Sequence, residues 1–345
     1  MPKSTIFDVA KLAGVSIKTV SRVVNREPNV RESTQQRVEK AVAELNYRPD
    51  QSARNLASHR SHLIGLVYDD PAAYEMPSGG YILDLQRGAL RACRSLMSEL
   101  LIHPCNYRQK DVGSELKSLI QQTRLSGMVL AAPVSNIPKI VRAIEATGTP
   151  FVRLSPGKTD GNQFAVTTND REVCAEMTCY LAGLGHKSIG FITGDPDHHA
   201  VTNRFLGFKD GLAASQLKFD KRLVAAGDNS FGSGEKCAHQ LLKLKNRPTA
   251  IFAANDDMAA GVIRAAHALG INVPGELSVA GFDDVALARQ VDPVLTTIRQ
   301  PLVRMAERAT SLLIKDGAAT AGKKAFECIP ATIKIRSSTG PPAAA

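Results

Sequence analysis

Residues 5–25 read TIFDVAKLAGVSIKTVSRVVN. Thr5 can cap a short helix, and Asp8 three residues later provides a weak form of the capping box. A compact apolar stripe at helical spacing follows, made of Val9, Ala10, Leu12 and Ala13. Gly14 comes next, and a glycine there breaks the helix. The stretch therefore predicts a short, capped helix that stops at Gly14.

A second helix is expected directly after this glycine. Ser16 is its N-cap candidate, and the helix would span residues 17–25. Two short helices joined by a turn that contains glycine form a helix-turn-helix, whose second helix enters the DNA major groove. A third helix is expected over residues 31–45, with an apolar face that would cover the first two. The N-terminal segment is thus predicted to be an all-α DNA-binding module.

The positive charge of the chain is concentrated in the same segment. Residues 1–60 hold 11 Lys and Arg against 6 Asp and Glu, whereas the rest of the chain holds 32 against 27. The net charge per residue is therefore about five times higher in the first 60 residues, which indicates a polyanionic partner. A basic surface without a partner is the alternative. Because the charge coincides with the helix-turn-helix motif, double-stranded DNA is favoured.

Length and composition limit the number of domains and the classes of protein to which the chain can belong. A length of 345 residues with 43% apolar residues leaves room for two or three domains with real cores. There is no charged stretch followed by an apolar core at the N-terminus and no segment long enough for a membrane span, so we expect a cytoplasmic chain with no membrane partner. The cysteines are scattered and form no zinc spacing, so we expect reduced thiols, no metal and no cofactor.

From residue 62 onward, short apolar strands alternate with amphipathic helices. Strands are expected over 63–68, 100–104, 127–131, 151–154, 188–193, 250–254 and 277–282, and helices over 81–99, 170–184 and 258–269. This alternation predicts an α/β fold with parallel sheets and helices on both faces. The βα pattern occurs twice, which fits two similar lobes with a ligand cleft at the carboxyl ends of the strands.

Six short sequence blocks follow one another in a specific order along the chain. They are the N-terminal run, NYRP at 46–49, LGHKSIGFI at 184–192, RFLGF at 204–208, ANDDM at 254–258 and GFDD at 281–284. In this order the chain resembles the LacI/GalR family of bacterial transcription regulators from about residue 4 to about residue 335. The resemblance implies a homodimer with a headpiece at 1–48, a hinge helix at 49–60 and a two-lobed, periplasmic-binding-protein-like core at 61–337. We expect residues 338–345 to be a disordered tail.

The start of the second helix is where side chains reach base edges, and the resemblance implies that Ile17 and Lys18 set operator preference. Lys18 could donate to a guanine and Ile17 could pack on a thymine methyl, while Arg22 could contact guanine in bidentate fashion. The alternative is that Lys18 and Arg22 touch only phosphates. Further DNA-contact or capping candidates are Thr5, Ser16, Thr19, Ser21, Asn25 and Tyr47.

The linker before the core contains Leu56, which matches the apolar wedge of the family. Two such leucines, one from each subunit, would enter the minor groove, unstack a base step and bend the duplex. Simple packing is the alternative for a lone leucine in a polar linker, but Ala53 and the Tyr-Arg-Pro junction favour the wedge. The chain departs from the family at Arg31, where a small capping residue usually begins the third helix.

For the effector, the resemblance assigns ligand contacts to Arg204, Asn255 and Asp283. Arg204 and Asp283 could hold a pair of sugar hydroxyls as donor and acceptor, or they could form a structural ion pair across the cleft. The first lobe would add Asp69, Tyr81 and Ile82, and the last candidate is Gln300.

Two departures bear on ligand specificity. Some sugar-binding relatives use a tryptophan in the cleft; this chain has none, and Asn229 falls near that position. Arg153 stands where many relatives have an aspartate, and a buried arginine needs an anionic partner. That partner could be Asp69 or Asp70, or a phosphate or carboxylate on the effector. We rank a neutral saccharide first, an acidic or phosphorylated sugar second and a nucleobase third.

No catalytic motif is present. The run DPDHH at 195–199 resembles a metal site, but adjacent histidines point in different directions and rarely share an ion, so a polar loop is favoured. Neither a phosphate cradle nor a nucleophile elbow occurs, and we expect no enzyme activity. The sequence therefore predicts a dimeric repressor of sugar-utilisation genes that a saccharide inducer releases from a pseudo-palindromic operator. A corepressor-dependent regulator and a sugar-binding protein without a regulatory role are the alternatives.

Overall fold

The computed structural model describes residues 4–24, 30–47, 62–69, 79–157, 164–317 and 325–343. The chain divides into two compact units, residues 1–61 and residues 62–345. Within the described ranges, no helix is long and apolar enough to cross a membrane.

In its described residues, the N-terminal unit contains three helices, α1 (Ile6–Ala13), α2 (Ile17–Val24) and α3 (Glu32–Glu44). The predicted capping box is present, since the Thr5 backbone N–H donates to Asp8 Oδ2 over 2.8 Å and the Asp8 N–H donates to Thr5 Oγ1 over 3.4 Å. Gly14 ends α1 with a φ of 61°, a conformation that costs glycine nothing. Ser16 accepts the Thr19 N–H over 3.2 Å and thereby caps α2.

The core of this unit consists of small apolar side chains on the facing sides of the three helices. They are Val9, Ala10, Ala13, Val20, Val23, Val38 and Ala41. Leu12, which we expected in the apolar stripe, is 48% exposed instead. Arg31 precedes α3 and gives it no side-chain cap, which matches the departure from the family at this position.

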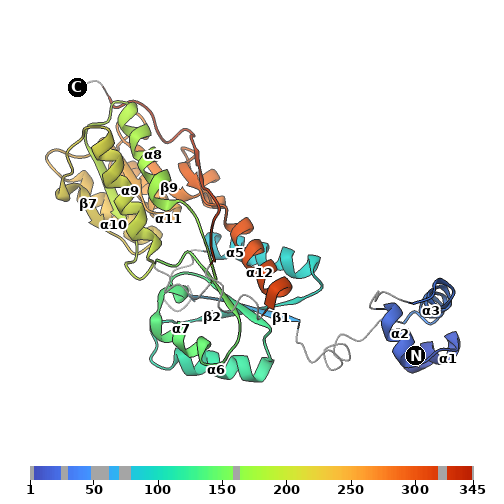
Figure 1. Cartoon of the computed structure of the whole chain (residues 1–345). Helices are drawn as coiled ribbons and strands as arrows, with labels where there is room; N and C mark the ends of the chain where they lie inside the picture. The colour runs from blue at the N-terminus through green and yellow to red at the C-terminus, as the bar shows by residue number, and fades with distance from the viewer. Residues whose placement is uncertain are drawn as a thin grey trace. The chain divides into compact units, whose positions relative to one another are not determined.

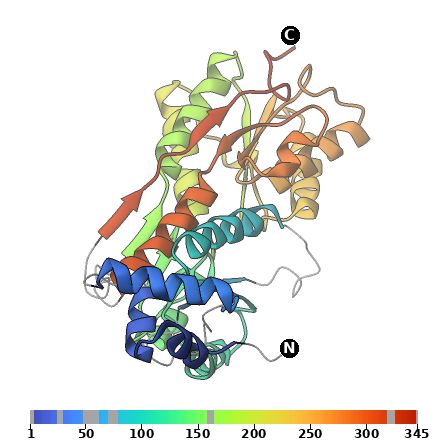
Figure 2. The same cartoon turned by 90° about the vertical axis from the view of Figure 1, so that its right-hand side faces the viewer.

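The larger unit contains two six-stranded sheets (Figures 1 and 2). The first sheet has the order β11-β5-β4-β3-β1-β2, and each of its pairings is parallel. Its strands are β1 (Leu63–Asp69), β2 (Glu99–Cys105), β3 (Gly127–Leu130), β4 (Phe151–Leu154), β5 (Phe164–Thr167) and β11 (Ala325–Cys328). Its helices are α5 (Gly80–Ser95), α6 (Val112–Thr123), α7 (Pro138–Glu145) and α12 (Leu302–Asp316). We call this sheet and these helices the first lobe.

The second sheet has the order β12-β10-β9-β8-β6-β7 and is parallel except for the antiparallel pair of β10 and β12. Its strands are β6 (Ile189–Thr193), β7 (Val224–Ala226), β8 (Ala250–Ala253), β9 (Ser278–Asp283), β10 (Thr296–Arg299) and β12 (Thr332–Lys334). Its helices are α8 (Asp170–Gly183), α9 (Ala200–Ala214), α10 (Phe231–Leu242) and α11 (Asp256–Ala268), which complete the second lobe. Short 3-10 helices are η2 (Val134–Asn136), η3 (Lys221–Leu223) and η4 (Ala286–Arg289).

Each sheet separates two apolar layers. In the first lobe, α5 and α12 lie side by side and pack with Leu66 and Val152 on one face, while α6 and α7 pack with Val67 and Met128 on the other (Figure 2). Neighbouring residues of one strand thus point to opposite faces, as the pleat requires. The chain crosses between the lobes after β5, after β10 and after β11. The predicted α/β architecture is therefore confirmed.

The structure differs from the sequence prediction at the C-terminus. We expected disorder from residue 338, but Ser338 is fully buried and its hydroxyl donates to the Val279 carbonyl over 2.6 Å. The Gly340 carbonyl lies 2.9 Å from His186 Nε2. The Pro- and Ala-rich composition suggested a free tail, but its first residues satisfy polar groups of distant strands and are held by them.

Candidate functional site

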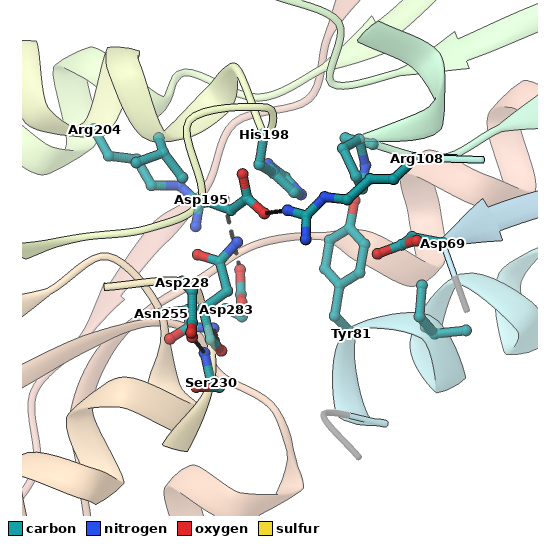
Figure 3. Close-up of a pocket in the computed structure, with 15 residues that line it drawn as sticks. Asp69, Tyr81, Arg108, Asp195, His198, Arg204, Asp228, Ser230, Asn255 and Asp283 are labelled. Atoms are coloured by element: carbon teal, nitrogen blue, oxygen red, sulfur yellow. Dashed lines mark hydrogen bonds and ion pairs between the residues drawn. The ribbon is translucent and has the colours of Figure 1, made fainter. Parts of the chain in front are cut away.

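A cavity of about 270 Å³ lies between the two lobes (Figure 3). Seven of the predicted effector residues line it: Asp69, Tyr81, Ile82, Arg204, Asn229, Asn255 and Asp283. Asp69 ends β1, Asp283 ends β9 and Asn255 follows β8, so these side chains gather where parallel strands end. This edge is where folds of this type place their ligands.

Arg204 is held rigidly within the second lobe. It is 3% exposed, its Nε lies 2.9 Å from Asp170 Oδ1, and one of its terminal nitrogens donates to the Ala254 carbonyl over 2.6 Å. The guanidinium also lies 3.6 Å from the ring centre of Phe282, a cation–π contact. Its ion pair with Asp283 is longer, at 3.7 Å. Both partners belong to the second lobe, so the ion pair that we considered across the cleft is instead internal to one lobe.

Asp283 has capacity for a further interaction. Burial raises the pKa of its carboxyl from 3.8 to about 7, although Arg204 opposes the shift. Its Oδ1 is buried and accepts no hydrogen bond from the part of the chain that the structure describes. A carboxyl group with this pKa can either donate or accept a hydrogen bond at neutral pH. It is therefore suited to a ligand hydroxyl, which can also do both.

His198 was not among the predicted effector residues, but it lines the cavity (Figure 3). Burial lowers the pKa of its imidazole to about 3, with a further contribution from Arg204, so the ring is neutral. Its Nδ1 has no hydrogen-bond partner within the described residues. The ring meets Tyr81 edge to face at 5.9 Å, and burial raises the pKa of the Tyr81 hydroxyl, which stays protonated.

The two asparagines contribute mainly by shaping the wall. Asn255 Oδ1 accepts the Met258 N–H over 2.9 Å and so caps α11, while its Nδ2 donates to the Asn229 carbonyl over 2.8 Å. Asn229 adopts a positive φ of 73°. The positional match of Asn255 to a ligand contact is thus combined with a structural role.

Further polar side chains that the sequence analysis did not select also line the cavity, namely Arg108, Asp195, Asp228 and Ser230. Arg108 lies 2.6 Å from Asp195 Oδ2. Burial opposes the ionisation of Asp228, but hydrogen bonds from Ser230 and Ser233 lower its pKa. Their signal in the sequence was weak, because each follows a strand end in a loop without periodicity. Asp195, two residues after the strand predicted at 188–193, was the detectable part of it.

Arg153 and Gln300 do not line this cavity. The Nε of Arg153 donates to the Ser135 carbonyl over 2.7 Å, and Arg153 lines a neighbouring cavity of about 590 Å³. Val152 and Leu154 point into the layer shared with α5 and α12, so alternation along β4 sends Arg153 to the other face. Gln300 is buried just after β10, and its amide atoms have no hydrogen-bond partner in the described ranges. Asp70, the other proposed partner of Arg153, lies outside these ranges.

In the N-terminal unit, the candidate DNA contacts that the structure describes lie on α2 or near the ends of the helices in the sequence, and they differ in exposure. Ile17 is 41% exposed, Lys18 and Ser16 are exposed, and Arg22 is half-buried. Thr19, Ser21 and Tyr47 are also half-buried, and Thr5 is exposed beside α1. The candidates Asn25, Ala53 and Leu56, together with the expected hinge helix, lie outside the described residues. Phe7, which we did not select, is 65% exposed on α1.

Comparisons with known proteins agree over both units. Residues 5–50 match the model for bacterial regulatory proteins of the lacI family, and residues 178–339 match a periplasmic binding protein-like domain. The transcriptional regulator DegA of Bacillus subtilis is 32% identical over 98% of this chain and 99% of its own. The ribose operon repressor of Escherichia coli is 32% identical over 90% of this chain and 92% of its own.

Solved structures show the same architecture. The lac repressor dimer bound to operator and an anti-inducer superimposes with a TM-score of 0.80 at 26% identity, covering 98% of this chain and all of that one. A complex of the regulator CelR with cellobiose gives a TM-score of 0.75 at 24% identity over 97% of this chain and all of that one.

Proposed function

Because the chain belongs to the LacI family of bacterial transcription regulators, we propose that it is a repressor which a small neutral saccharide releases from its operator. DNA binding and transcriptional regulation follow from family membership. The identity of the effector, the direction of the response and the homodimer are the proposed parts. A saccharide effector is supported by the names of two similar proteins, the ribose operon repressor and the complex of CelR with cellobiose.

The charged side chains that line the cavity are the observation that favours a neutral effector over an anionic one. Among the described residues, the carboxylates of Asp69, Asp195 and Asp228 line it against the two guanidiniums of Arg108 and Arg204, and Asp283, with a pKa of about 7, adds a partial negative charge. Arg204 is already bound to Asp170, and Arg108 to Asp195. An anionic effector would enter a site with excess negative charge and would be repelled. A polyhydroxylated neutral ligand can use the carboxylates as acceptors.

The size of the cavity points to a small sugar. At about 270 Å³ it is slightly below the range of about 300–1,000 Å³ typical of small-molecule sites. A monosaccharide is therefore favoured over an oligosaccharide. Arg153, which suggested a phosphorylated effector, faces the neighbouring cavity instead.

We also propose that two copies of the chain bind DNA together in the cytoplasm. Two-fold symmetry of a dimer predicts a pseudo-palindromic operator with one half-site for each headpiece. Sugar binding would close the cleft and shift the protein towards a form with lower affinity for the operator.

The test begins with selection of DNA from a random-sequence pool by the full chain, followed by fluorescence anisotropy on the selected site. The effector panel contains D-ribose, D-glucose, cellobiose, ribose 5-phosphate and hypoxanthine. We expect a pseudo-palindrome and a loss of DNA affinity with one neutral monosaccharide. Binding to DNA only in the presence of a panel compound would establish a corepressor and overturn induction.

Arg153→Ala separates the neutral effector from the anionic one. We expect the neutral sugar to release DNA from this variant at the same concentration as from the unaltered chain. A response to ribose 5-phosphate that disappears in Arg153→Ala would instead identify an acidic effector and overturn the neutral assignment.

A further inference from the structure

The run DPDHH at residues 195–199 follows β6 and contacts the opposite lobe. In the described ranges, no group of three or more potential ligands is placed to hold a metal ion. Instead, Asp195, Asp197 and His198 each contact a side chain of the first lobe. The run that resembled a metal site is therefore a connection between lobes.

The strongest part of this connection is a chain of hydrogen bonds that ends on two carboxylates. The Tyr107 hydroxyl donates to Asp197 Oδ2 over 3.0 Å and accepts from Arg108 Nε over 3.0 Å. Arg108 also reaches Asp195 Oδ2 over 2.6 Å. Tyr107 is only 3% exposed. Burial, together with Asp195, raises the pKa of its hydroxyl, so Tyr107 remains a donor to the carboxylate.

A second contact lies beside the first. Asn136 Nδ2 donates to the Asp197 carbonyl over 3.2 Å, and Asn136 Oδ1 accepts the Gly157 N–H over 3.2 Å. A methyl group on Gly157 would lie 2.3 Å from Cβ of His199, closer than atoms in contact can approach. The absence of a side chain at Gly157 is therefore what allows the lobes to come this close.

The same run also forms part of the cavity wall. Asp195 and His198 line the cavity, and Figure 3 shows both beside Arg108. The run thus faces the ligand position on one side and is bonded to the first lobe on the other. A ligand that contacts Asp195 or His198 would favour the geometry in which the bonds of Tyr107 and Asn136 form.

We propose that residues 195–199, held by Tyr107, Arg108 and Asn136, form a clasp that stabilises the closed arrangement of the two lobes. Tyr107 and Asn136 are positioning residues, because they set how readily the cleft closes without lining the cavity. The clasp bonds require no ligand, so the ligand-free chain has a measurable closed population. The inference rests on the proposed function only in taking the cavity as the effector site.

The clasp would set effector sensitivity. A ligand that binds only the closed form has an apparent Kd equal to its intrinsic Kd divided by the closed fraction. Removing a hydrogen bond to a charged group changes an equilibrium by about tenfold or more. Loss of the Tyr107 hydroxyl would therefore lower the ratio of closed to open populations about tenfold, and the apparent Kd would rise by the factor by which the closed fraction falls.

The test measures the distance between the lobes directly. Spin labels are attached to keto amino acids that replace the exposed Lys117 on α6 and Lys243 after α10, which leaves the native cysteines unmodified. Double electron–electron resonance on the ligand-free full chain then gives the closed and open populations. Tyr107→Phe removes one hydroxyl, and Gly157→Ala blocks the approach of His199. The matched control is Tyr180→Phe, whose hydroxyl bonds Thr339 within the second lobe.

We expect both clasp variants to lower the ratio of closed to open populations about tenfold, while Tyr180→Phe leaves this ratio unchanged. Circular dichroism checks folding, and Gly157→Ala keeps every clasp side chain in case Tyr107→Phe is unfolded. A ligand-free chain without a closed population, or clasp variants that match the control, would overturn the clasp. Because no sugar is added, failure of the panel to release DNA would count against the proposed function and not against the clasp.

Discussion

The N-terminal unit and the cavity of the core place their candidate functional side chains in opposite environments. On α2, Ile17 is 41% exposed and Lys18 is also exposed. The core of this unit is a small cluster of valines and alanines. In the cavity, Arg204 and Asp283 are 3% and 7% exposed. The headpiece therefore presents the start of α2 to solvent, whereas the core buries Arg204 and Asp283 among charged neighbours.

The difference predicts how each region responds to substitution. An exposed side chain that packs on nothing can change with little effect on folding. A buried charged group must be paired by its neighbours, so its removal leaves another charge without compensation. We therefore expect cavity substitutions to change stability together with ligand binding, and substitutions of polar side chains on α2 that lie outside its core to change mainly DNA affinity.

The largest effect is expected for Asp170→Ala. The change leaves the buried Arg204 without its nearest carboxylate, and breaking a buried ion pair typically costs about 3–5 kcal/mol. Urea unfolding of the full chain measures the loss. Asp210→Ala is the control, because its pair with Arg171 is exposed and should contribute far less. Equal losses of unfolding free energy in Asp170→Ala and Asp210→Ala would contradict the distinction between a buried and an exposed ion pair.

Asp283→Asn is expected to change the pH dependence of stability. The folded pKa of about 7 lies above the ordinary value of 3.8, so the stability that this group contributes is fully present below pH 4. It is lost as the pH rises through 7. The variant should lack this loss and gain up to about 4 kcal/mol over the unaltered chain between pH 4 and pH 8. If the free energy of unfolding depends on pH in the same way in both proteins, Asp283 is ionised in the folded chain throughout this range.

The effector that releases DNA in the panel should also bind Asp283→Asn more weakly than it binds the unaltered chain.

Arg22→Ala tests the headpiece. If Arg22 contacts a guanine, the variant should lose about 1–3 kcal/mol of operator affinity and tolerate other bases at that position. The midpoint of urea unfolding should stay close to that of the unaltered chain. Anisotropy titrations with the selected operator and with single-base variants measure both properties. A loss that is equal for all sequences would assign Arg22 to a phosphate.

Lys18→Ala should have the smallest effect of the four. If Lys18 touches only a phosphate, the affinity for DNA falls uniformly across sequences. The slope of log K against the logarithm of the salt concentration then decreases in magnitude by about 1. If Lys18 reads a guanine, the loss is confined to operators that carry it. Titrations at several salt concentrations distinguish the two cases. A fall in unfolding stability in this exposed variant would break the contrast between headpiece and core.

Much of the fold could be predicted because its signals are local. The capping residues Thr5 and Ser16 and the helix break at Gly14 each act within a few residues of the chain. The strands missed by the sequence analysis are three or four residues long, namely β5 (Phe164–Thr167), β7 (Val224–Ala226), β10 (Thr296–Arg299), β11 (Ala325–Cys328) and β12 (Thr332–Lys334). Segments of this length show too few alternations to be distinguished from loops.

The candidate site was predictable to the extent that strand ends could be located. Asp69 and Asp283 were selected with the family resemblance, and the structure places both at the cavity. Arg108 and His198 were missed, because a loop residue shows its role only once the other lobe is known. Arg153 lines the neighbouring cavity and not this one, and the sequence did not show which face of β4 it occupies.

The sequence by itself determined the helix-turn-helix, the exposed start of its second helix and the alternation that makes two parallel sheets. Those features depend on hydrogen bonds and periodicity within short segments. Only the tertiary structure decided that Arg204 pairs with Asp170, that Tyr107 reaches Asp197 and that the tail packs as far as Gly340. Each of these contacts joins residues more than 30 positions apart, and the pairing follows from how sheets and helices pack.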